Sequence, residues 1–99
     1  MKVINIEEKF SKFTDQWSPK IVSELNGQQV KLAKLEGEFV WHSHEHEDEL
    51  FMVFKGILKM HFRDKTVTVK PGEFITVPKG VEHCPVAENG EVHLLLFEP

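Results

Sequence analysis

The chain has little cysteine, few clustered basic residues and no long apolar run, and each shortage excludes a class of protein. Its single cysteine, Cys84, has no partner for an intrachain disulfide, so a disulfide-stapled domain is excluded and a reducing cytoplasm is predicted. The 12 Lys and Arg residues stand against 16 Asp and Glu residues and are scattered along the chain. Nucleic acid is therefore not a predicted partner, because its recognition needs concentrated positive charge.

The apolar stretches are short and are interrupted by charge, so no segment is predicted to span a membrane. Residues 1–8 include three charged side chains and no uninterrupted apolar segment, which is not the pattern of a secretory signal. The 99 residues contain no internal repeat and match the length of one domain. We therefore expect a single domain, residues 1–99, with one modest core.

Histidine and acidic residues are concentrated in one stretch, residues 42–49. His42 and His44 are two positions apart, so on an extended strand both imidazoles project from the same face. After a short polar turn, Glu49 begins an apolar run that is predicted to be the returning strand. A fourth polar group is offered by His83, further along the chain. Imidazoles and a carboxylate suit a first-row divalent metal.

Residues 37–56 resemble the first sequence motif of the cupin family. In this motif Gly37 is followed by the His42-x-His44 pair, four residues, Glu49, six residues and Gly56. The spacer between Gly37 and His42 is four residues, where the family usually has five.

Residues 72–87 resemble the second cupin motif. Gly72 is followed by five residues, the Pro78-x-Gly80 triplet, two residues and His83. Ala87 stands where the family often has an asparagine, which removes one polar group near the site. The segment between the two motifs, residues 57–71, is 15 residues long.

This resemblance implies an all-β fold, a single-domain cupin jelly-roll barrel of antiparallel strands. It also implies a metal site made by His42, His44, Glu49 and His83. Four polar groups inside a small apolar barrel are costly to desolvate unless they are paired, and one cation satisfies all of them. Iron, manganese, nickel, zinc and copper all remain possible, because ligand type alone does not select among them.

The order of patterns along the chain agrees with a barrel. Asn5 as N-cap and a helical spacing of apolar residues predict one short helix at residues 6–13. Eight or nine short strands follow, with Asn26-Gly27 as a hairpin turn and a bulge at Glu36-Gly37. We place strands at 20–25, 30–35, 39–44, 49–54, 57–62, 66–70, 74–77, 81–86 and 92–97, with a loop at 87–90.

Other polar residues have a structural and a functional interpretation. His46 is interpreted as a solvated loop residue, with alternate ligand or proton shuttle as the other reading, and Asp48 as exposed or as a carboxylate that orients a ligand imidazole. His61 and His93 have no convergent partner, so surface or packing roles are favoured. Cys84 is expected to face away from the metal and to be buried.

Three functions remain open. The first is a metal-dependent enzyme, an oxygenase, isomerase or lyase that acts on a small anionic or enolisable molecule, with Glu49 as a ligand and as a catalytic base. The second is a non-catalytic module that binds a sugar or a carboxylate. The third is a metal-free cupin whose histidines hydrogen-bond one another. If His42 faces inward, Phe39 and Trp41 face outward, and with the apolar last strand they predict a homodimer.

Overall fold

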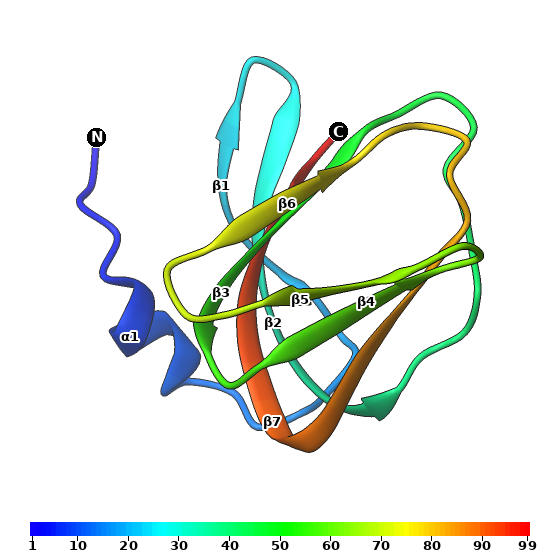
Figure 1. The fold of residues 1–99 in the computed structure, drawn as a ribbon. Coiled ribbons are helices and arrows are strands. Elements are labelled where there is room, and N and C mark those ends of the chain that lie inside the picture. The colour runs from blue at the N-terminus through cyan, green and yellow to red at the C-terminus, as the bar shows by residue number, and fades with distance from the viewer.

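The chain folds into seven antiparallel strands and one short helix, as a computed structural model of residues 1–99 shows (Figure 1). Along the sheet the strand order is β1-β2-β7-β3-β6, and β4 pairs with both β5 and β7. This confirms the predicted all-β fold of antiparallel strands with one short helix. The elements are α1 (Ile6–Phe10), β1 (Lys20–Leu25), β2 (Gln28–Glu38), β3 (Glu49–Lys55), β4 (Leu58–Phe62), β5 (Thr66–Val69), β6 (Phe74–Val77) and β7 (His83–Glu98).

The last strand, β7, is one continuous element of 16 residues, so the predicted loop at 87–90 is wrong. Its first part pairs with β4, and its second part lies between β2 and β3. The strand bends sharply between these parts, at the bottom of Figure 1, where its colour changes from orange to red. Gly90, with φ of +110°, lies between the two paired parts of the strand. A loop was predicted here because glycine is also typical of loops.

The hairpin and the bulge were predicted correctly. Asn26 and Gly27 have φ values of +52° and +80°, as a two-residue turn between β1 and β2 requires. The register of β2 against β7 shifts between Leu35 and Gly37. At this shift β2 leaves the regular part of the sheet and approaches the segment that carries His42.

The predicted strand at 39–44 is wrong, since only His42 in this segment makes a β-bridge, with His83. The segment is otherwise irregular, so strict alternation of side chains is lost. Phe39 does not face outward as expected: its ring lies 5.3 Å from the ring of His42. Val40, which alternation placed inside, is 62% exposed, and Trp41 is half-buried with the guanidinium of Arg63 above its ring.

The helix is shorter than predicted, ending at Phe10 rather than at residue 13. Asn5 is its N-cap, and the side-chain oxygen of Asn5 accepts a hydrogen bond from the Glu8 amide at 2.9 Å. Phe10 is buried and stacks on the ring of His93. Phe10 and Phe13 therefore pack as anchors, and α1 lies against the outside of the barrel (Figure 1).

The two faces of the sheet formed by β2, β7, β3 and β6 differ in burial. The inner face holds the core, which includes Leu35, Phe51, Val53 and Leu94. Side chains directly paired across neighbouring strands share a face. On the outer face these pairs join apolar residues that are half-buried, Val30 to Phe97, Phe97 to Leu50, and Leu95 to Met52. Leu32, which pairs with Leu95 on this face, is already fully buried. No helix of the chain has the length and apolar character needed to cross a bilayer.

Candidate metal centre

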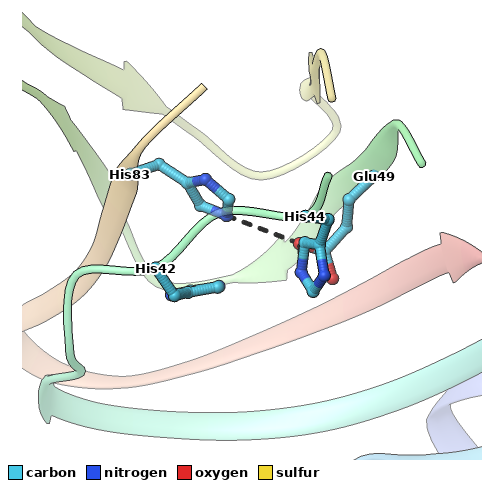
Figure 2. Close-up of side chains that lie close together, drawn as sticks. All are labelled: His42, His44, Glu49 and His83. Carbon is cyan, nitrogen blue, oxygen red and sulfur yellow. Dashed lines mark ion pairs between the residues drawn. The ribbon is translucent and has the colours of Figure 1, made fainter. Parts of the chain in front are cut away.

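The four predicted ligand residues lie together inside one end of the barrel. His42 and His44 come from the irregular segment between β2 and β3, Glu49 is the first residue of β3, and His83 is the first residue of β7. Figure 2 shows their side chains converging from these separate segments. One potential ligand atom from each residue lies within 4.8 Å of the others. Metal–ligand bonds of about 2.1 Å hold opposite ligands about 4.2 Å apart, so a slight contraction would close the shell.

Backbone carbonyls fix the orientation of two of the imidazoles. The Nδ1 of His42 lies 3.0 Å from the carbonyl oxygen of Val40, and the Nδ1 of His83 lies 2.9 Å from that of Val81. A carbonyl only accepts hydrogen bonds, so each Nδ1 is the donor and carries a proton. The Nε2 of each neutral ring is then left with a free lone pair, as a metal ligand requires.

Two buried polar atoms of the cluster make no hydrogen bond, namely Oε1 of Glu49 and Nε2 of His83. They lie 3.5 Å apart, and Nε2 of His44 lies 3.4 Å from the same carboxylate oxygen. Glu49 is 6% exposed and His83 is 1% exposed, so water does not compensate them. A carboxylate oxygen that faces the lone pair of the neutral His83 ring is unfavourable unless a positive charge lies between them. The residues present therefore fit a bound cation.

The electrostatics of the cluster favour a neutral His42 and an ionised Glu49. Burial, the largest effect, lowers the pKa of His42, which keeps its ring neutral. Burial raises the pKa of Glu49, but the neighbouring His83 and Glu98 lower it more strongly, and the net pKa is about 2. Burial lowers the pKa of His83, yet Glu49 and the Val81 carbonyl together raise it above the ordinary value.

Backbone hydrogen bonds join the two motif segments independently of any metal. The amide of each of His42 and His83 donates to the carbonyl of the other, at 3.0 and 2.9 Å. The Gly80 amide donates to the carbonyl of His44 at 2.7 Å, and the Lys79 amide donates to the carboxylate of Asp48 at 2.9 Å. Asp48 therefore holds the loop of the second motif against that of the first. The hypothesis that Asp48 orients an imidazole is replaced by this contact.

The comparisons with known proteins agree with this geometry. A family model described as a cupin domain matches residues 23–98, which include all four residues of the cluster. This chain belongs to the cupin family.

Two solved structures match this cupin over nearly its whole length. A cupin-2 domain containing protein from Shewanella frigidimarina is 48% identical, with a TM-score of 0.96, and the match covers 98% of this chain and 94% of that chain. A protein from Neisseria meningitidis is 33% identical, with a TM-score of 0.89 and coverage of 98% of both chains.

Among curated proteins, the cupin is similar to YdbB of Bacillus subtilis, which is described as uncharacterized. The two are 38% identical over 79 residues, which is 79% of this chain. The match covers 64% of YdbB, so the cupin corresponds to a little under two thirds of that relative.

The other predicted polar residues lie outside the cluster. The side chain of His46 is 88% exposed in the loop, as its structural interpretation expected. His61 contacts the hydroxyl of Thr66, and His93 contacts the carboxylate of Glu91 and packs under Phe10. The thiol of Cys84 is buried on the side away from the cluster, near the carbonyl of Phe39, and burial raises its pKa.

A second carboxyl group, which was not predicted from the sequence, lies beside the cluster. Glu98, near the end of β7, lines the same cavity as Glu49 and is paired with Lys31 at 2.8 Å. Burial, followed by the nearby Glu49, raises the pKa of Glu98 to about 7 despite Lys31. The sequence does indicate that Glu98 points inward, because Leu94, Leu96 and Glu98 occupy alternate positions on the same face of β7.

Proposed function

We propose that the cupin binds one divalent transition metal through His42, His44, Glu49 and His83, and that it uses this metal to act on a small anionic or enolisable molecule. The observation that carries the proposal is the pair of buried, unpartnered atoms, Glu49 Oε1 and His83 Nε2, facing each other across the cluster. A metal-free site held by histidine–histidine hydrogen bonds is not favoured, because the buried nitrogen of His83 makes none.

The chemistry follows from the charge and the number of the ligands. Three neutral imidazoles and one carboxylate leave a divalent ion with a net charge near +1 and two positions of an octahedral shell for substrate or water. A metal so held acts as a Lewis acid that polarises oxygen groups or lowers the pKa of water. An anionic head that supplies oxygen ligands is therefore the complementary substrate group. Oxygenase, isomerase and lyase reactions share this requirement.

Metal binding predicts a bound metal and a large thermal shift. Cupin purified without chelator should contain close to one equivalent of transition metal by elemental analysis. Metal at 100 times its Kd should stabilise the stripped protein by about 2.7 kcal/mol, because it binds only the folded state. For a domain of this size that is a rise in Tm of roughly 10–20 °C. Stripped protein that takes up no metal and shows no shift would refute the proposal.

Catalysis is separated from simple binding by turnover. Metal-loaded cupin is incubated with small keto acids and sugars, and products are followed by mass spectrometry. Conversion that stops when the metal is removed supports the enzyme. Binding without conversion supports the non-catalytic module.

The cytoplasmic location remains a prediction.

We also propose that the cupin is a homodimer in which the outer faces of β2, β7 and β3 pack sheet against sheet. The expected reason was an outward Phe39 and Trp41 together with the apolar last strand. The last strand does contribute Leu95 and Phe97 to the outer face, but Phe39 and Trp41 lie against His42 and Arg63. The support comes instead from the half-buried apolar row across these strands, Val30, Phe97, Leu50, Leu95 and Met52, with Phe74 beyond it at 61% exposure. Apolar patches of this kind mark interaction surfaces.

The dimer predicts a mass near twice the 11.5 kDa of the chain in size-exclusion chromatography with light scattering. Met52→Lys, at the centre of the patch, should give a monomer, because an unpaired lysine is costly to bury in an apolar interface. Thr68→Lys adds the same charge at an exposed position of β5 and should remain dimeric. A monomeric wild-type protein would refute the dimer, and a dimeric Met52→Lys variant would refute this interface.

A further inference from the structure

The cavity that leads to the metal cluster is almost entirely apolar. Its volume is about 380 Å³, within the roughly 300–1,000 Å³ range of small-molecule sites. Its only ionisable side chains are His42, His44, Glu49 and Glu98. No lysine, arginine, serine, threonine or amide side chain lines it. The polar groups are thus the cluster itself and one carboxyl group beside it, and the remaining walls are aliphatic or aromatic.

This distribution excludes a ligand with polar groups along its length. A sugar ring carries several hydroxyl groups, and each would lose its hydrogen bonds to water on entering this cavity. Glu98 could compensate one such group at most, since its Oε1 already accepts a hydrogen bond from Lys31 at 2.8 Å. The complementary ligand has a single polar end, which meets the metal, and an apolar body.

The outer wall of the cavity is a pair of stacked aromatic rings. The rings of Trp17 and Phe39 lie 4.8 Å apart and are nearly parallel, at 11°. Phe39 in turn places its ring 5.3 Å from the ring of His42, at 82°. Aromatic surface is therefore continuous from the mouth of the cavity to the first imidazole of the cluster, and flat apolar bodies pack well on such surfaces.

Trp17 is held in this wall at a conformational cost. Its φ is +58°, in the left-handed region that a bulky residue rarely adopts. Two hydrogen bonds hold it there: its amide donates to the carbonyl of Lys34 at 2.9 Å, and its indole Nε1 donates to the carbonyl of Glu36 at 3.0 Å. Backbone strain that the surroundings maintain is concentrated at functional sites. Because the amide and the indole nitrogen of Trp17 both donate hydrogen bonds to β2, its ring offers a ligand only apolar surface.

We propose that the cupin binds a small molecule with a planar apolar body and one anionic head, and that the Trp17–Phe39 wall selects the body while the metal binds the head. The inference rests on the proposed metal site and adds the substrate class. A single negative charge on the head matches the net charge near +1 of the occupied cluster.

The test compares three probes on cobalt(II)-loaded protein. Pyruvate carries the anionic head alone, phenylpyruvate carries the same head with a phenyl body, and glucuronate carries a carboxylate on a polar body. Cobalt content is measured first by elemental analysis. The visible spectrum of the cobalt then reports coordination of the head, and calorimetry gives the affinities.

Phenylpyruvate is expected to bind roughly 10- to 100-fold more tightly than pyruvate, the ratio expected from burying a phenyl ring. Glucuronate is expected to bind no more tightly than pyruvate. Phe39→Ala should reduce the advantage of phenylpyruvate over pyruvate to less than about threefold, with both affinities measured on variant protein of known cobalt content. Phe74→Ala removes an exposed ring outside the cavity and should keep the full advantage.

The failures of the two proposals are distinguishable. Protein without cobalt refutes the metal site. Cobalt-loaded protein that binds glucuronate best, binds both keto acids equally, or binds neither refutes the apolar substrate class and leaves the metal site standing. An undiminished preference in Phe39→Ala refutes the role of the wall.

Discussion

Replacing Glu49 with glutamine is expected to lower the affinity of the cupin for a divalent metal by more than about 100-fold, since loss of even an outer partner of a ligand costs 10- to 100-fold. Glu49 supplies the only negative charge of the proposed shell, and its Oε1 faces both His44 and His83. Glutamine keeps the volume of this 6% exposed side chain but leaves the bound ion with a charge of +2 in an apolar site. The measurement is a competitive titration against a chromophoric chelator.

Glu47→Gln is the matched control for this experiment. Glu47 lies two residues before Glu49 in the loop that precedes β3, it is exposed, and it is outside the cluster. The substitution removes the same charge at the surface, where exposed charges interact weakly with their surroundings. Its metal affinity should stay within about threefold of the wild type. Equal losses in both variants would mean that Glu49 acts through the general charge of the loop and is not a ligand.

Gly56→Ala is expected to destabilise the fold by about 3 kcal/mol, a large fraction of the roughly 5–15 kcal/mol of a small domain. Gly56 has φ of +81°, and a Cβ there would lie 2.7 Å from the carbonyl oxygen of Glu91 and 3.1 Å from a methyl carbon of Val92. The left-handed conformation costs about 1 kcal/mol for alanine, and forced overlap in a packed region typically adds 1–3 kcal/mol. Urea denaturation of the stripped protein measures the loss.

Gly72→Ala separates the two causes. Gly72 has nearly the same φ, +85°, but a Cβ there would meet no atom within 4 Å. It should therefore cost only the conformational part, about 1 kcal/mol. The expected difference of about 2 kcal/mol between the variants measures the overlap with β7. Equal losses would show that backbone conformation alone requires glycine at position 56.

That the four side chains of the cluster lie close together could be predicted, because spacing and motif identity do not depend on regular structure. His42, His44, Glu49 and His83 meet even though the strand expected at 39–44 is absent. The two backbone hydrogen bonds between His42 and His83 place the imidazoles where strand alternation was expected to place them. A long-range bridge between residues 41 positions apart leaves no local pattern in the sequence.

The aromatic wall could not be predicted for the same reason. Phe39 follows the bulge at Gly37, after which alternation no longer tells which side faces inward. Trp17 reaches the cavity through a left-handed backbone that no propensity favours for tryptophan. Glu98 differs from both, since the alternation of β7 points it inward and only the expected end of the strand at Phe97 hid it.

The length of β7 has a consequence for how the molecule opens. This strand begins at His83, ends at Glu98 and is hydrogen-bonded to β2, β3 and β4. Because β7 is paired with three strands, its backbone hydrogen bonds open only when the sheet comes apart, so its amides should exchange with deuterium through global unfolding. The amides of α1 and β5, which have few partners, should exchange through local fraying. His83, a ligand of the proposed metal site, thus belongs to the slowest-exchanging part of the molecule, and a bound ion should slow exchange along the whole of β7.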